Sequence, residues 1–261
     1  MMQMRRGAVV SAIALLSAAC SSSSSTTTSS AAVPTPLTVF AASSLTKAFT
    51  QIGQDFQTAE PNVTVTFDFG SSTDLAAQIQ SEGTADVFAS ASGTAMDTVE
   101  GDPGVTDRTN FATNQLAIIT PPDDPAGISS LNDLTRSGVK LVLAAEGVPV
   151  GDYARQALKS AGILSQAMAN LVSNEDDDAS VVAKVTSGDA DAAIVYTSDV
   201  ASAGGSVRSV TIPSAVNVVA TYPIAVVTGS GQTDSATSFL NYVVGPAGQA
   251  TLKEFGFGPA G

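Results

Sequence analysis

Apolar and polar positions along the first half of the chain predict strands and helices in turn. Short apolar or alternating runs are typical of strands, and apolar residues three or four apart are typical of helices. Phe49, Ile52 and Phe56 have helical spacing before Pro61, and Gly83 follows a second helical pattern. The predicted elements are strands at 37–42, 63–69 and 85–91 and helices at 46–59 and 74–83.

The second half repeats this succession. Its predicted elements are a strand at 140–146, helices at 151–162 and 178–189, and a strand at 192–198. Alternating strands and helices indicate an α/β fold with a mostly parallel sheet. The apolar segments 112–120 and 218–228 are interpreted as the two crossings of a hinge. We therefore expect two α/β lobes with a ligand cleft between them: lobe I at 37–113 and 221–261, and lobe II at 114–220.

The N-terminal residues have the pattern of an export signal. Arg5 and Arg6 precede an apolar run at 7–19 that is too short to cross a bilayer. Cys20 follows in "LLSAAC", which resembles a bacterial lipoprotein processing site. We expect residues 1–19 to be a signal peptide, Cys20 to be lipidated at the outer face of the cell membrane, and residues 20–36 to form a flexible Ser/Thr-rich tether. Plain secretion is the alternative.

Composition narrows the chemistry. The 261 residues include no His and one Cys, which excludes His-based acid–base catalysis and metal sites built from His or several Cys. The net charge is −13, and it becomes −15 once Arg5 and Arg6 leave with the signal. Such a surface repels nucleic acid and anionic lipid, so we expect no nucleic-acid partner and membrane contact only through the lipid anchor.

Four loops open predicted helices, and the first three of them follow predicted strands. They are "AASSLT" (41–46), "FGSSTDL" (69–75), "EGVPVGDY" (146–153) and "NEDDDAS" (174–180), and Tyr196 ends a further strand. Helix N-termini present unpaired N–H groups, and Ser or Thr there adds a hydroxyl donor. Converging at one cleft, these loops predict an anion site that needs no Lys or Arg.

Each loop taken alone has a simpler structural explanation. Ser44 and Ser72 are good N-caps, the glycines suit tight turns, and Tyr196 fits a core. The acidic run 175–178 is typical of a solvated turn that caps a helix, and it lacks the spacing of an EF-hand calcium loop. Only the combination of the loops favours a binding site.

The combination also resembles a known family. "VFAASSLTKAF", "FGSSTDLAAQI", "ADVFASA", "GVPVGDYARQAL", "AAIVYTSD" and "VVGPAGQATLKEFGF" resemble, in order and spacing, the molybdate-binding ModA family of bacterial ABC importers. The resemblance implies a type II periplasmic binding protein fold and a monomer that is not an enzyme and has no cofactor. It implies that the protein binds molybdate or tungstate outside the membrane and delivers it to separate permease and ATPase subunits.

The resemblance also implies a ligand set. Ser44 and Ser72 would donate hydroxyls, Val150 its backbone N–H, Tyr196 its phenol, and Asp178 a backbone N–H. Ser43 and Asp177 are additional candidates, and the metal would be held only through its oxygens. Relatives carry a small apolar residue near Asp178, and this sequence differs from them there. A carboxylate at this position would repel a dianion unless it turned outward as a helix cap.

This ligand set predicts selectivity by size and protonation. A site made only of donors disfavours phosphate, which carries a proton at neutral pH, and sulfate would be excluded by its smaller size. Because none of the named donors titrates near neutrality, we expect affinity to be constant between about pH 6 and pH 8.

Two alternatives stay open. One is a binding protein for another anion such as sulfate. The other is a serine acyl-transfer enzyme in which Ser44-x-x-Lys47 is the first motif and Ser130-Leu131-Asn132 the second, although a K-T-G motif is missing.

Overall fold

The computed structural model describes residues 34–260. The predicted signal peptide, Cys20 and the predicted tether up to residue 33 lie outside the described residues. Strand β1 begins at Thr35, two residues before its expected start. No helix within residues 34–260 combines the length and apolar character needed to cross a bilayer.

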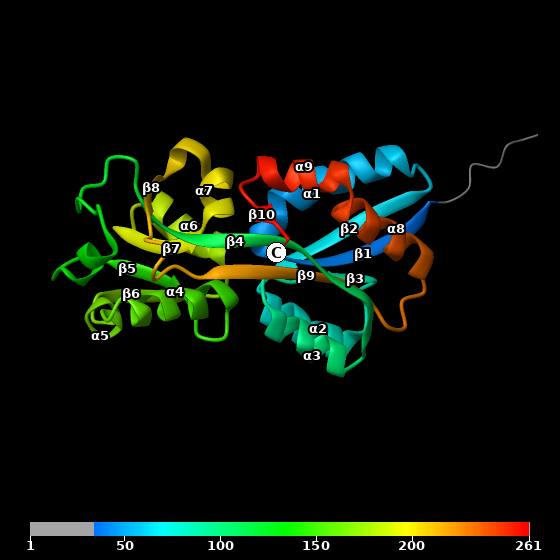
Figure 1. The fold of residues 1–261 in the computed structure, drawn as a ribbon, viewed down its shortest axis with the longest axis horizontal. Coiled ribbons are helices and arrows are strands. Elements are labelled where there is room, and N and C mark those ends of the chain that lie inside the picture. Colours follow the sequence, from blue (N-terminus) through cyan, green and yellow to red (C-terminus); the bar gives the residue numbers. More distant parts are fainter. Residues whose placement is uncertain (1–33, 261) are drawn as a thin grey trace, which may run out of the picture. The chain divides into compact units, whose positions relative to one another are not determined.

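The chain folds into two lobes that share a long strand, β4 (Figure 1). Lobe I contains β1 (Thr35–Ala42), η1 (Ser43–Leu45), α1 (Thr46–Ala59), β2 (Val63–Gly70), α2 (Ser72–Glu82), β3 (Val87–Ala89), α3 (Gly93–Gly101), β9 (Val219–Val227), α8 (Thr233–Val244), α9 (Pro246–Glu254) and β10 (Gly258–Pro259). Lobe II contains η2 (Leu131–Thr135), β5 (Leu141–Ala144), α4 (Pro149–Ser160), α5 (Leu164–Met168), β6 (Leu171–Glu175), α6 (Asp178–Thr186), β7 (Ala192–Tyr196), α7 (Thr197–Ala203), η3 (Gly204–Ser206) and β8 (Arg208–Thr211). Strand β4 spans Val105–Thr120.

Strand pairing explains how the chain passes between the lobes. The strand order is β2-β1-β3-β9-β4-β7-β5-β6, with β1 parallel to β2 and β3, and β5 parallel to β6 and β7. Strand β4 pairs with β9 as far as Gln115 and with β7 from Leu116. The segment that leads back to lobe I just before β9 is bound to β4 at this point. The Asn217 side chain accepts from the Leu116 N–H at 3.1 Å and donates to the Leu116 carbonyl at 2.9 Å. These two crossings form the expected two-segment hinge. The exact lobe limits at 113/114 and 220/221 stay a prediction.

Helices cover both faces of each lobe (Figure 1). In lobe I, α1, α8 and α9 lie on one face of the strands and α2 and α3 on the other; in lobe II, α6 and α7 lie opposite α4 and α5. The lobe I core is aromatic: the Phe49 ring contacts those of Phe67, Phe111 and Phe239 at centroid distances of 5.7–6.2 Å. Gly53 of α1 leaves room for this cluster, because a Cβ there would lie 2.6 Å from the Phe67 ring.

Candidate functional site

The carboxyl ends of the parallel strands meet at a small cavity between the lobes. Its volume is about 10 Å³, roughly the room of one water molecule. All four loops singled out in the sequence contribute to it, as does the end of β7. The lining residues are Ala42, Ser43, Ser44, Gly70, Ser71, Ser72, Ala91, Val148, Pro149, Val150, Asp178 and Tyr196. The cavity thus brings together five predicted ligand residues and Ser43, while Asp177 is absent from its wall.

The hydroxyls of Ser44 and Ser72 are not used as helix caps. Neither η1, α1 nor α2 has a side-chain cap hydrogen bond, so the capping interpretation of these two serines is wrong. Ser44 Oγ lies 3.0 Å from the Tyr222 hydroxyl, and Ser72 Oγ accepts from the Ala91 N–H at 2.9 Å. Because Ser72 acts as an acceptor in that bond, its own O–H proton is free for another acceptor.

Two buried hydroxyls of the wall have no protein partner. Tyr196 is 1% exposed and Ser71 5% exposed, and neither hydroxyl forms a hydrogen bond within the described residues. Burial raises the pKa of Tyr196 well above its ordinary value, so the phenol keeps its proton and acts as a donor. The motif "FGSST" predicts Ser72 as a ligand residue and gives no signal for Ser71. Only burial and hydrogen bonding distinguish the two serines, and both properties depend on the tertiary structure.

Helix α4 contributes a backbone donor. Pro149 is its first residue and Val150 its second, so the Val150 N–H has no partner inside the helix. Gly151 allows this helix end to approach strand β5: a Cβ there would lie 2.3 Å from the Ala145 carbonyl oxygen and 2.4 Å from that of Ala144. The close approach places Val150, 2% exposed, in the cavity wall.

The acidic turn differs from the sequence-based expectation. Asp177 is the residue that caps α6, accepting from the Ser180 N–H at 2.7 Å. Asp178 does not turn outward; it is 4% exposed, lines the cavity and accepts a hydrogen bond from the Ser43 hydroxyl of lobe I. Its second oxygen, Oδ2, has no partner among residues 34–260. The wall therefore contains one carboxyl group among hydroxyl and amide donors.

This carboxyl group belongs to a buried pair. Asp199 accepts from the Tyr196 N–H at 2.9 Å, and its carboxyl lies within hydrogen-bonding reach of that of Asp178. Burial raises the pKa of Asp178 to about 6 and that of Asp199 well above its ordinary value. The expectation of a pH-independent site assumed that none of its groups titrates near neutrality, and Asp178 contradicts that assumption.

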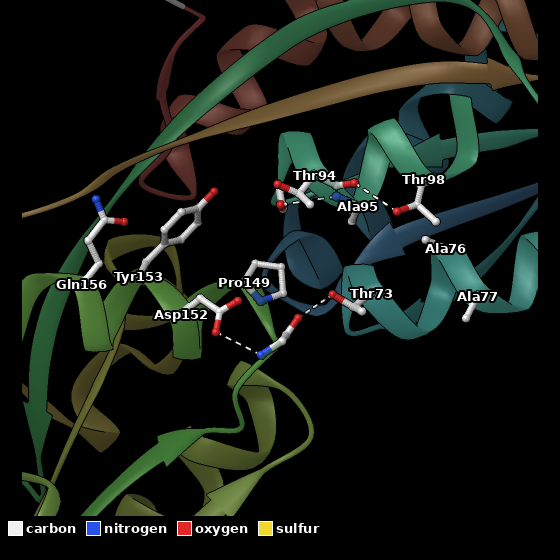
Figure 2. Close-up of a pocket in the computed structure, with 12 residues that line it drawn as sticks. Thr73, Ala76, Ala77, Thr94, Ala95, Thr98, Pro149, Asp152, Tyr153 and Gln156 are labelled. Atoms are coloured by element: carbon white, nitrogen blue, oxygen red, sulfur yellow. Dashed lines mark hydrogen bonds between the residues drawn. The ribbon is translucent and has the colours of Figure 1, made fainter. Parts of the chain in front are cut away.

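A larger cleft adjoins the cavity at Pro149, which lines both (Figure 2). It has a volume of about 480 Å³ and lies between α2 and α3 of lobe I and α4 of lobe II. Thr73 Oγ1 donates across it to the Gly147 carbonyl at 2.5 Å, and the Gly147 N–H donates to Asp152 at 2.9 Å. Among the residues that the structure describes, no buried and unpartnered side-chain donor lines this cleft, so we assign the binding chemistry to the cavity.

The geometry does not supply a serine nucleophile with a lysine base. Lys47 is exposed, and its ammonium donates to the Ser202 carbonyl in lobe II. Ser44 is instead hydrogen-bonded to Tyr222. Within the part of the chain that the structure describes, no group of three or more acidic, His or Cys side chains is arranged to hold a metal ion.

Known proteins are similar to this chain in sequence. The model of the bacterial extracellular solute-binding protein family matches residues 37–258. The molybdate-binding protein ModA of Mycobacterium tuberculosis is 40% identical over 227 residues, covering 85% of this chain and 84% of that protein. ModA of Escherichia coli is 31% identical over 229 residues, covering 85% and 88%.

A solved structure shows the same fold at lower identity. The periplasmic molybdate-binding protein of Azotobacter vinelandii superposes with a TM-score of 0.75 at 19% identity, covering 85% of this chain and 98% of that one. The two-lobe arrangement is thus that of a type II periplasmic binding protein. The chain belongs to the bacterial extracellular solute-binding proteins and, within them, to the ModA family.

Proposed function

We propose that this protein binds molybdate outside the membrane and delivers it to the permease of an ABC importer. The observation that carries the proposal is the pair of buried, unpartnered hydroxyls in one cavity, those of Tyr196 and Ser71, together with the Val150 N–H, which has no partner inside its helix. Buried donors without an acceptor are costly unless a ligand supplies one. The names of the ModA relatives indicate which anion this is.

Neutral donors are sufficient for a dianion. A hydrogen bond to a charged acceptor contributes about 1.5–3 kcal/mol, and micromolar affinity needs about 8 kcal/mol. The hydroxyls of Ser44, Ser72 and Tyr196, with the backbone N–H of Val150, supply four such bonds. The net charge of −13 does not oppose this, because local dipoles determine the site while global charge affects encounter and solubility.

Binding requires the cavity wall to move. A tetrahedral oxyanion is larger than a cavity of about 10 Å³, and the Ser43–Asp178 hydrogen bond crosses it between the lobes. We propose that the lobes separate about the β4 and Asn217 hinge to admit the anion and then close over it. The closed form would be recognised by separate permease and ATPase subunits.

Tungstate, which has nearly the same size and charge, should bind comparably. Sulfate is smaller and should bind weakly.

The protein should act as a monomer, held at the outer face of the cell membrane through lipidated Cys20. Replacing Cys20 by Ser should release it from the membrane fraction, and retention of the variant there would contradict the lipid anchor.

Isothermal titration with molybdate, tungstate, sulfate and phosphate tests the binding function. We expect one-to-one binding of molybdate and tungstate and little heat with sulfate. Ser44→Ala should weaken binding at least tenfold, while the matched control Ser165→Ala, at an exposed position on α5, should not. Absence of heat with molybdate, or equal competition by sulfate, would contradict the proposal.

A further inference from the structure

The Asp178–Asp199 carboxyl pair lies between two cavities. Asp178 lines the small cavity, and Asp199 lines a neighbouring cavity of about 240 Å³ that also includes Lys47. Ser43 and Ser44 line both. The pair therefore connects the binding cavity with a second cavity through two carboxyl groups in hydrogen-bonding reach of each other.

The orientation of Asp178 indicates a role toward the ligand. Its Oδ2 is buried without a partner in the same wall as the unpartnered Tyr196 hydroxyl. An ionised carboxylate only accepts hydrogen bonds, and so do the oxygens of a dianion. The two can meet favourably only if one proton lies between them.

We propose that Asp178 makes oxyanion binding proton-coupled, so that the dianion enters the cavity together with one proton that Asp178 then shares with an oxygen of the anion. This inference rests on the proposed binding function. The proton comes from solvent through the neighbouring cavity and Asp199, and no bond of the anion breaks. Whether the proton resides on Asp178 or on the anion, the complex contains one proton more than the empty protein and the free dianion together.

Among residues 34–260 no cation pairs with the carboxyl groups of Asp178 and Asp199 in place of this proton, and the Lys47 ammonium donates to the Ser202 carbonyl. The elements packed against α6 carry few ionisable groups. Strand β5 and η1 have none, and the two on β4, Asp107 and Arg108, lie in the half of that strand that belongs to lobe I. The remaining groups near the pair are Asp177, Glu175 at the end of β6, Tyr196, Tyr222, Lys47 in the neighbouring cavity and Lys184 in the last turn of α6.

The pKa values set the size of the expected effect. With the pKa of Asp178 at about 6, that carboxyl is mostly ionised at pH 7 in the empty protein. Linkage then gives uptake of about 0.9 proton per molybdate at pH 7 and affinity that falls about fifty-fold from pH 6 to pH 8. Molybdate itself stays a dianion over this range, so the change reports on the protein.

Titration calorimetry with sodium molybdate at pH 6, 7 and 8, in two buffers of different ionisation enthalpy, measures both quantities. The wild-type protein should show the loss of affinity and a buffer-dependent heat that corresponds to nearly one proton. In Asp178→Asn the side-chain amide is a donor at every pH. The molybdate affinity of this variant should therefore vary less than twofold between pH 6 and pH 8, and binding should take up no proton. The control Asp176→Asn removes an exposed charge two residues away and should keep the wild-type pH dependence.

The outcomes separate this inference from the binding function. Tight molybdate binding by the wild type with constant affinity and no proton uptake would overturn the inference and leave the function standing, and so would a full pH dependence in Asp178→Asn. No heat at any pH would overturn both. The wild-type proton count needs no variant, so the test holds even if Asp178→Asn fails to fold.

Discussion

The hydroxyl oxygens of Ser44 and Tyr222 lie 3.0 Å apart although 178 positions separate the two residues in the chain. The Asn114 amide nitrogen lies 3.3 Å from the same Tyr222 oxygen and, as a donor, makes Tyr222 the acceptor there. Tyr222 can therefore give its proton to Ser44, which leaves the Ser44 O–H free to donate into the cavity. The hinge strand β9 thus orients a ligand donor of lobe I.

Removing the Tyr222 hydroxyl should weaken molybdate binding through Ser44. Tyr222→Phe keeps the ring contacts with Phe111, Tyr196 and Phe257. It loses the hydrogen bonds of the hydroxyl with Ser44 and Asn114, of which only the first reaches a ligand donor, so we expect about fivefold weaker binding. Ser44→Ala should cost tenfold or more. In the double variant the Tyr222 change should add nothing further, because Tyr222 acts through Ser44. Calorimetry on the four proteins measures this coupling, and additive losses would show that Tyr222 acts independently.

Tyr196→Phe should change stability and binding in opposite directions. The buried hydroxyl has no partner among residues 34–260, so its removal should leave the melting temperature unchanged or raise it by a few degrees. The same change removes a donor to a dianion and should weaken molybdate binding about tenfold or more. Scanning calorimetry and titration of the same sample test both effects. A loss of stability would mean that the hydroxyl has a structural partner.

Ser71 and Ser72 should differ although they are neighbours. Ser72→Ala leaves the buried Ala91 N–H without its acceptor, at a cost of about 1–3 kcal/mol and a fall of several degrees in melting temperature. Ser71→Ala breaks no protein hydrogen bond and should melt like the wild type. Urea unfolding of the two variants provides the comparison. Equal destabilisation would contradict the assigned hydrogen bonding.

Local sequence patterns predicted the helices and strands whose apolar residues are buried in the core. Helix 46–59 is confirmed to the residue, because Phe49, Ile52 and Phe56 are fully buried and the helix ends just before Pro61. The strand predicted at 192–198 ends early, at Tyr196, because the Asp199 carboxyl binds the Tyr196 N–H and α7 begins at Thr197. This side-chain hydrogen bond ends the strand two residues earlier than its sequence pattern predicts.

Edge and surface elements were missed for a different reason. Strand β6 is a short edge strand whose alternate residues are exposed, and it precedes the acidic turn directly, so its apolar pattern is weak. Helix α3 has an N-cap at Ser92 but only three buried residues. Neither element carries enough apolar periodicity to predict it from one sequence.

Within the site, sequence placed the strand ends but not the side-chain contacts. The residues at the cavity follow from the loops between strands and helices, which parallel pairing brings together. The partner of Ser44 lies in a distant strand, and Asp178 rather than Asp177 faces inward because Asp177 caps α6. The first outcome depends on a tertiary contact with the hinge strand β9. The second depends on which of three consecutive Asp residues caps the helix, and the acidic run alone does not distinguish them.

The free energy of unfolding of the ligand-free protein should decrease as pH rises, because of Asp178. Its pKa is raised from 3.8 to about 6, so between these values the folded protein holds a proton that the unfolded chain has lost. The folded state therefore binds more protons than the unfolded state in this pH window. The contribution of Asp178 to the free energy of unfolding decreases as pH rises through the window and is constant above it. Asp178→Asn should match the wild type near pH 4 and exceed it above pH 6.5 by on the order of 2 kcal/mol. Urea unfolding at both pH values tests the sign, and a constant difference would contradict it.

The Thr73–Gly147 hydrogen bond should slow release of the anion. It joins the first turn of α2 to the loop before α4 at 2.5 Å and crosses the cleft beside the cavity (Figure 2). Thr73→Val keeps the shape and removes the donor, so opening the lobes should become easier by about 1 kcal/mol, and molybdate should dissociate about fivefold faster. The control Thr98→Val alters the same cleft at a hydroxyl that bonds only to Thr94 within α3, and it should leave the rate unchanged. Stopped-flow displacement of molybdate by excess tungstate measures both variants, and equal acceleration by the two would show that the cleft surface, not the interlobe bond, controls release.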